Sequence, residues 1–284
     1  MSDYDKIYRI VTLHSWDEVT DHFAKCRSVF SGWIFRGHQN ADWLLTTTLE
    51  RAAVERFGIS WVEIPSIEQG LVRRFQRQLH LYSAEVQAEE LNFMELLALM
   101  QHHGAPTRLL DWTYSFFVGV YFAIEAAKPD HPCAVWAVDR DWWRERARGH
   151  LPSDAKKLLE SDINAKKDKT VRQILLHDPP LKTVHPLNAF RLSTRHVVQQ
   201  GAFLVPGDVT KSFMENLQGI ADRSADQHII KFELPCDRQF LKDAIENLHR
   251  MNINRATLFP GLDGFAKHLE ALIVVPRARA VDED

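Results

Sequence analysis

The stretch Tyr114–Ala127 carries apolar residues on nearly every side of a helix, and it strongly constrains how this chain can fold. A helix without a polar face must be covered all round, because water would otherwise contact apolar side chains. A membrane is not the expected cover, since the chain has no apolar run of about 18 residues or more. The stretch therefore predicts a helix inside the core of a globular protein.

A string of polar residues, His102–Thr113, comes directly before this apolar stretch. It holds two imidazoles, a guanidinium, a carboxylate, an indole and hydroxyl groups. A second helix is predicted before it over 93–103, with Asn92 and Glu95 as a capping box at its start and Gly104 after its end. Polar side chains held between two apolar helices form either a functional site or a fully hydrogen-bonded network.

The remaining pattern predicts a mixed α+β protein, because strands and helices do not alternate in regular βαβ order. The sequence has neither a GxGxxG string after a strand nor a P-loop, which argues against a Rossmann fold and against an NTPase. Ser15 is expected to cap the first helix. Helices are predicted over 16–27, 66–82, 93–103, 114–127 and 237–250, and strands or extended segments over 6–13, 33–38, 107–113, 134–138, 197–205, 227–234 and 271–275.

The charge balance is close to neutral, with 35 Lys and Arg against 38 Asp and Glu in 284 residues. This balance argues against a protein that coats nucleic acid and against a polybasic membrane protein, but it does not exclude a local basic groove. The N-terminal residues lack the apolar core of a signal peptide, and Cys26, Cys133 and Cys236 form no CxxC motif. We therefore expect a cytoplasmic protein with reduced thiols and no membrane partner.

Arg36 lies inside an apolar strand and is followed by Gly37, which suggests close approach of another backbone or of a ligand. An arginine in such a strand needs a partner, because an unpaired buried charge is very costly. Two interpretations are equally supported. Arg36 either forks onto a phosphate or carboxylate of a ligand, or it pairs internally with a carboxylate such as Asp111.

Thr113 stands at the expected N-terminus of the apolar helix, where it caps the helix or favours an anion. Capping explains Thr113 well but does not explain Arg108 and Asp111 together. Adjacent His102 and His103 cannot both face one metal ion from a helix, so a zinc site is disfavoured. A metal-dependent hydrolase or nuclease that uses these histidines with Asp111 is the last-ranked hypothesis, and no metal is expected.

Two further groups of polar residues follow in the sequence. The first group contains Gln199 and Gln200, in the strand predicted over 197–205. A glutamine that faces inward from this strand must hydrogen-bond the backbone or a ligand hydroxyl, and the backbone is favoured. The charged segment 139–188 predicts a helical insert whose tryptophans and arginines could bind single-stranded nucleic acid, although a solvated helix face is the more common outcome. The residues concerned are Arg195, His196, Gln199 and Gln200 in the first group, and Trp142, Trp143, Arg140, Arg144, Arg146 and Arg148 in the second.

Several of these strings together resemble the FRG domain family. The resemblance spans about residues 15–275 and implies a single FRG-type domain over 1–284, with the insert at about 139–188 as its divergent part. The strings that carry it are Phe35–Gly37, His103–Thr113, Gln200–Phe203 and, for the C-terminal end, Phe259–Gly264.

The chain also resembles ADP-ribosyltransferases, in which a first strand carries an arginine, a second ends in Ser or Thr before an apolar helix, and a third carries a catalytic glutamate. Arg36-Gly37 matches the first element, Leu110–Thr113 the second and Gln199–Phe203 the third. This resemblance implies a mixed, mainly antiparallel split sheet with flanking helices, and NAD as substrate.

The same resemblance implies residue roles. The catalytic set is Arg36, Asp111, Thr113 and Gln200, and the NAD-binding set is Arg36, Gly37, His38, Arg108, Trp112 and Tyr121. Gln200 stands near the place of the catalytic glutamate, and a neutral amide cannot supply the negative charge that stabilises an oxocarbenium-like state. Asp111 is the alternative source of that carboxylate.

The implied function is an NAD-dependent ADP-ribosyltransferase-like effector, a toxin or anti-phage defence protein, that modifies nucleic acid or protein. An antitoxin or another protein is a candidate partner. The alternative from a different class is a non-catalytic module that binds nucleic acid or protein, in which Arg36, Arg108 and Asp111 form a buried network.

Overall fold

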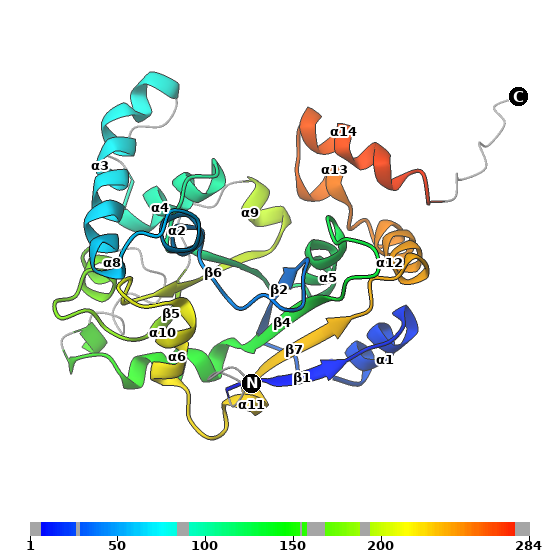
Figure 1. Ribbon diagram of the computed structural model, residues 1–284, viewed down its shortest axis with the longest axis horizontal. Coiled ribbons are helices and arrows are strands. Elements are labelled where there is room, and N and C mark those ends of the chain that lie inside the picture. Colours follow the sequence, from blue (N-terminus) through cyan, green and yellow to red (C-terminus); the bar gives the residue numbers. More distant parts are fainter. Residues whose placement is uncertain are drawn as a thin grey trace, which may run out of the picture.

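The computed structural model describes residues 7–26, 29–83, 91–153, 155–157, 168–187 and 194–275. Seven strands in this part of the chain form one sheet in the order β1-β7-β4-β2-β3-β6-β5 (Figure 1). Neighbouring strands are antiparallel except β1 and β7, which are parallel. The strands are β1 (Arg9–Thr12), β2 (Trp33–His38), β3 (Leu110–Thr113), β4 (Cys133–Asp139), β5 (Val184–Leu187), β6 (Gly201–Pro206) and β7 (Ile229–Leu234). The mixed α+β class and the mainly antiparallel sheet are therefore confirmed.

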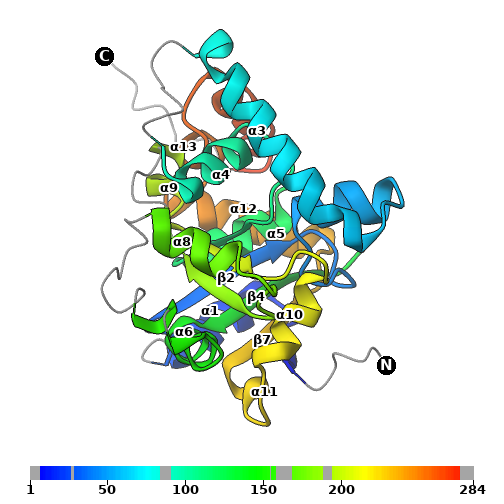
Figure 2. The same cartoon turned by 90° about the vertical axis from the view of Figure 1, so that its left-hand side faces the viewer.

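Helices cover both faces of this sheet (Figures 1 and 2). They are α1 (Trp16–Cys26), α2 (Thr48–Glu50), the π-helix η1 (Arg51–Arg56), the 3₁₀ helix η2 (Trp61–Glu63), α3 (Ile64–Tyr82), α4 (Phe93–His102), α5 (Phe116–Ile124), α6 (Arg140–Gly149), α8 (Asp168–Leu175), α9 (Thr194–Val198), α10 (Phe213–Ile220), α11 (Ala225–His228), α12 (Arg238–Arg250), α13 (Arg255–Leu258) and α14 (Leu262–Ala271). None of the described helices is long and apolar enough to cross a membrane.

The apolar helix predicted from the sequence is α5, and it lies in the core on one face of the sheet. It begins at Phe116, because the Ser115 hydroxyl accepts a hydrogen bond from the backbone N–H of Val118. Alternate residues of the central strands divide between two cores. Phe35 and its neighbours pack with α1, α5 and α12, whereas Ile34 and its neighbours pack with α6, α10 and α11 on the opposite face.

Two separate groups of helices share the face that carries α5. The α1, α5 and α12 group covers β2, β4 and β7, while α3, α4 and α8 pack on β5 and β6. The short strand β3 lies between these halves and pairs with β2 through a single residue pair, Phe35 with Thr113. The face of β3 that carries Asp111 and Thr113 is therefore left between the two helical groups.

Two of the predicted strands are wrong in part or in whole. Residues 194–198 form helix α9 and a turn follows, so β6 begins only at Gly201. The apolar run 271–275 is the end of helix α14 and a turn, not a strand. Its apolar residues continue the helical spacing of Leu262, Phe265 and Leu269, which a short window at the C-terminal end does not reveal.

The segment 139–188 contains helices α6 and α8, as expected of a helical insert, but it also supplies part of the sheet. It ends in β5, the edge strand beside β6, which the sequence did not predict. Trp143 of α6 is fully buried in the core, and its indole N–H donates to the Val184 carbonyl at 2.8 Å. Residues 154, 158–167 and 188 of the segment lie outside the described residues.

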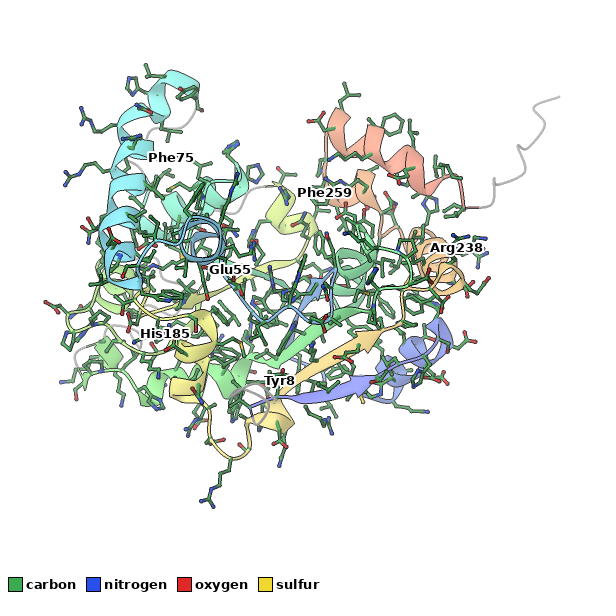
Figure 3. The ribbon with its side chains drawn as sticks, viewed as in Figure 1. Tyr8, Glu55, Phe75, His185, Arg238 and Phe259 are labelled. Atoms are coloured by element: carbon green, nitrogen blue, oxygen red, sulfur yellow. The ribbon has the colours of Figure 1, made fainter. Side chains whose placement is uncertain are left out.

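His185 on β5 gives the fold a dependence on pH (labelled in Figure 3). Burial lowers its pKa from 6.5 to about 4, and its Nε2 lies 2.7 Å from the Thr183 hydroxyl oxygen. Below pH 6.5 His185 is protonated in the unfolded chain but stays neutral in the folded chain. The free energy of unfolding should therefore fall by about 2 kcal/mol between pH 7 and pH 5. Denaturant unfolding should show this difference between wild type and His185→Gln. Equal losses in the two proteins would contradict it.

Candidate functional site

A cavity of about 490 Å³ opens between the two helical groups, over β2, β3 and β6. Five residues predicted for the site lie around it: Arg36, Gly37, Asp111, Trp112 and Thr113. They come from two strings that are more than 70 positions apart in the sequence. The antiparallel pairing of β2 with β3 is what brings these two strings to one place.

Arg36 is half-buried in the cavity and is held by two hydrogen bonds. Its Nη1 donates to the backbone carbonyl of Asp111 at 2.7 Å, and its Nε donates to Nε2 of His38 at 3.1 Å. Burial lowers the pKa of Arg36 to about 10, which leaves it positively charged at neutral pH. Among the described residues, Nη2 has no hydrogen-bond partner, so one edge of the guanidinium can bind a ligand.

His38 orients Arg36 from outside the cavity lining. Burial and the charge of Arg36 hold the pKa of His38 well below its usual range, so the ring is neutral. Because Nε2 accepts from Arg36, the proton is on Nδ1, which lies 3.4 Å from the Trp43 carbonyl. The structure places His38 behind the predicted NAD-binding arginine and not at the cavity surface.

Asp111 presents an exposed carboxylate to the cavity. Its Oδ2 accepts a hydrogen bond from Nε2 of Gln101 at 2.8 Å. Gln101 is itself fixed, because its Oε1 accepts from the hydroxyls of Thr48 and Thr107. The carboxylate is therefore oriented by an amide whose own position is determined by α4 and the loop before β3.

Thr113 is buried at the end of β3, and its hydroxyl is used twice within the protein. It donates to the Gln199 carbonyl at 2.7 Å and accepts from the Ser115 backbone N–H at 3.1 Å. The sequence favoured Thr113 as the cap of the apolar helix, but the capping residue is Ser115. Thr113 instead ties the end of β3 to the turn that follows α9.

Gln200 does not line the cavity, whereas Gln199 does. Gln200 is exposed in the turn before β6, with a φ of 50°, and its carbonyl accepts from the Tyr114 N–H. The side chain of Gln199 donates from Nε2 to the Leu258 carbonyl at 3.0 Å. The expected position of Gln200 fails because α9 replaces the first part of the predicted strand.

Three other residues of the predicted NAD-binding set have different surroundings. Arg108 is buried away from the cavity in an ion pair with Glu68 of α3. Trp112 reaches the cavity lining, but its ring belongs to the core on the opposite face of the sheet. The Tyr121 hydroxyl donates to Glu125 at 3.3 Å and lies outside the lining.

The cavity also contains a second guanidinium, that of Arg195 on α9. Its Cζ lies 4.4 Å from the centre of the Phe259 ring, and Arg255 contacts the same ring at 3.7 Å. Arg255 is paired with Glu125, which also lines the cavity. Figure 3 labels Phe259 beside α13. The string that begins at Phe259 is part of the FRG resemblance, but Glu125 has no sequence signal beyond being the acidic residue near the end of an apolar helix.

His196 completes the side of the cavity next to β6. Its ring lies 4.5 Å from that of Phe203, and a Cβ on Gly201 would come within 2.6 Å of its Nε2. Glycine is therefore needed at Gly201 for the imidazole to pack on the strand. Burial lowers the pKa of His196 despite the opposing effect of Asp111, so the imidazole is neutral at pH 7.

The arginines of the insert are largely neutralised. Arg140 and Arg144 both contact Asp141, and Arg146 pairs with Asp222 at 3.2 Å. Trp142 stacks on His228 with ring centres 4.8 Å apart. This group is a folded helix face with docked tryptophans. In the described part of the chain, no three His, Cys, Asp or Glu side chains are grouped to hold a metal ion.

One protein-family model matches part of this chain. The FRG domain model matches residues 31–131, a range that includes β2, α3, α4, β3 and α5 and thus both strings around Arg36 and Asp111. Searches of curated proteins and of solved structures found no significant match. The chain therefore contains an FRG domain over residues 31–131.

Proposed function

We propose that the cavity binds NAD and that the protein is an NAD-dependent ADP-ribosyltransferase-like effector. The observation that carries this proposal is the presence of an oriented carboxylate, Asp111, in the same cavity as two guanidinium groups, Arg36 and Arg195. The volume of about 490 Å³ is within the range of small-molecule sites. A toxin or anti-phage defence role follows only from the resemblance of the chain to compact effectors.

The charged and aromatic side chains of the cavity are complementary to different parts of NAD. Arg36 and Arg195 would bind the pyrophosphate, because guanidinium groups fork onto phosphate oxygens. Phe122 and Phe259 line the same cavity and offer ring surfaces for the nicotinamide or the adenine. We therefore assign stacking to these two rings and not to Trp112 or Tyr121, the aromatic residues of the NAD-binding set that the resemblance implies.

The reaction would break the bond between the nicotinamide nitrogen and C1′ of the ribose. Nicotinamide leaves with the bonding electron pair as a neutral molecule, and positive charge develops on the ribose. Asp111 would stabilise that charge electrostatically. The acceptor then forms a bond to C1′ and loses a proton, which the neutral imidazole of His196 can take.

Asp111→Asn tests the catalytic part of this proposal. The amide keeps the size of the side chain but removes its charge, so nicotinamide release should fall by about 100- to 1000-fold. NAD affinity should change by less than about threefold, because the arginines that would bind the pyrophosphate remain. Calorimetry measures the binding, and chromatography of nicotinamide with transfer of labelled ADP-ribose to total RNA or lysate measures the reaction.

Asp226→Asn is the matched control, because Asp226 is an exposed carboxylate on α11 and is not part of the cavity lining. It should behave as wild type in both measurements. Wild-type protein that neither binds NAD nor releases nicotinamide would sink the proposal.

The rival function is a module that binds nucleic acid or protein without catalysis. It is favoured by the two neutral glutamines, because Gln200 stands near the place of the expected glutamate and its neighbour Gln199 lines the cavity. The buried network proposed for it is different in the structure, since Arg108 pairs with Glu68 and Arg36 contacts only the backbone of Asp111. Binding of RNA or of a protein partner, without any nicotinamide release from NAD, would select this rival.

A further inference from the structure

Helix α3 carries a group of arginines that the cavity does not use. Arg73, Arg74 and Arg77 are exposed and, with Gly70 and Gln78, line a second hollow on the surface of the helix. None of the three arginines has a hydrogen-bond or ion-pair partner among the described residues. We call these three residues the α3 arginine face.

The arginine face is opposite to the side by which α3 is held. Consecutive helical residues are about 100° apart, which places Arg73, Arg74 and Arg77 within an arc of about 100°. Glu68, Val72 and Leu79 point the other way and are buried, with Glu68 in the ion pair to Arg108. The helix runs along the outside of the molecule (Figures 1 and 2). The guanidinium groups are therefore held toward solvent by a rigidly anchored helix.

This arrangement differs from that of the arginines in the insert. There, Arg140 and Arg144 share Asp141 and Arg146 pairs with Asp222, so two carboxylates offset two of the three positive charges. The chain as a whole has a formal net charge of -3. A local concentration of unpaired guanidinium groups on such a protein costs electrostatic repulsion, which a polyanion relieves on binding.

We propose that the α3 arginine face binds the phosphate backbone of a nucleic-acid strand, which is the acceptor of the proposed transfer reaction. The arginines make this surface polar and positive, and the exposed apolar side chains of the helix, Leu81 and Tyr82, lie at its C-terminal end and not among them. A phosphate-binding surface has this character, whereas a protein interface has a hydrophobic centre. Gly70 leaves the centre of the face flat, because an added Cβ would meet nothing within 4 Å.

Helix α3 is the neighbour of a helix that forms one wall of the cavity. It packs on α4, whose residues Ala98, Leu99, Gln101 and His102 line the cavity. Packed helices lie about 8–10 Å apart, and the arginine face is on the side of α3 that points away from α4. A strand bound there is separated from Asp111 by both helices, so another part of the same nucleic acid must extend to the cavity. The role of this strand as acceptor rests on the proposed transferase function, but binding of the strand to α3 does not require NAD.

The test is binding of a fluorescein-labelled 20-nucleotide single-stranded RNA, measured by anisotropy over a range of salt concentrations. Each phosphate contact makes binding weaker as salt increases. Three contacts should contribute about −2 to the slope of the log of the binding constant against the log of salt concentration. The triple variant Arg73→Gln, Arg74→Gln, Arg77→Gln should lose this slope and bind at least about tenfold more weakly at 50 mM salt. A triple Lys variant should keep most of the affinity, because the charges remain.

The matched control removes three arginines that already have acidic partners: Arg144→Gln, Arg146→Gln and Arg250→Gln. It has the same net charge as the α3 variant and should bind nearly as wild type. Labelled poly-glutamate is titrated in the same way, as a polyanion of protein chemistry. The proposal is overturned if wild type does not bind the RNA, if the α3 Gln variant and the control variant weaken RNA binding equally, or if the α3 arginines are needed for poly-glutamate binding but not for RNA binding. NAD binding and nicotinamide release should be unchanged in the α3 variant, so failure here leaves the proposed cavity function intact and separately testable.

Discussion

Replacing Arg108 with Met should lower the free energy of unfolding by about 3–5 kcal/mol, because it leaves the Glu68 carboxylate buried without its partner. Arg108 also donates to the carbonyls of Leu175 and Pro206, at 2.8 and 3.3 Å, so it joins α3, α8 and β6. For a chain of this size we expect a fall in melting temperature of roughly 10 °C. Thermal and denaturant unfolding measure both quantities.

Arg250→Met is the matched control for this prediction. Arg250 forms an ion pair with Glu246, but its side chain is 66% exposed, and exposed pairs contribute under about 1 kcal/mol. The double variant Arg108→Met, Glu68→Leu should recover part of the loss, because two apolar side chains can fill the place of a buried pair. A single Arg108→Met variant as stable as wild type would show that the pair does not hold α3 to the fold.

Gly37→Ala should destabilise the protein by about 3 kcal/mol or more through steric overlap. A Cβ at this position would overlap the backbone nitrogen of Ala123 and the carbonyl oxygen of Gly119, and would lie 2.6 Å from the carbonyl carbon of Phe122. These atoms belong to the backbone of α5, so no side chain can move aside. Loss of soluble protein, or a large fall in melting temperature, is the expected result.

Gly70→Ala is the corresponding control on an open helix surface. Nothing lies within 4 Å of an added Cβ there, and alanine is favoured over glycine inside a helix, so stability should rise by about 0.5–1 kcal/mol. Equal behaviour of the two alanine variants would mean that β2 and α5 do not approach as closely as the structure shows.

Gly37 and its neighbour Arg36 show how much of the site can be predicted from the local sequence. The sequence suggested close approach of a backbone or a ligand at Gly37, and the structure shows that a backbone approaches. The sequence also offered Arg36 two partners, and the structure gives it a carbonyl of Asp111 instead of the carboxylate. In both cases the local pattern indicated a constraint, but its partner came from a segment far away in the chain.

The errors have a common physical origin. The apolar neighbours of Gln200 predict a strand, yet helix α9 forms before it and Gln200 lies in the turn after α9, where Gln199 and not Gln200 lines the cavity. Arg108 was grouped with Asp111 because they are close in sequence, but they point to different parts of the fold. The partner of Arg108 is Glu68, which lies 40 positions earlier on α3. Pairings of this kind depend on packing between elements, which a single sequence does not encode locally.

The sequence by itself determined the α+β class, the buried helix α5, the caps at Ser15 and Asn92 and the importance of the strings around Arg36 and Asp111. These features follow from hydrophobic periodicity and from hydrogen bonds between residues three or four positions apart. Only the tertiary structure decided that β3 lies between two helical groups, that Arg195 shares the cavity with Asp111, and that the unpaired arginines are on α3. Those outcomes depend on contacts between distant segments, where burial and charge neutralisation are settled only once the chain has folded.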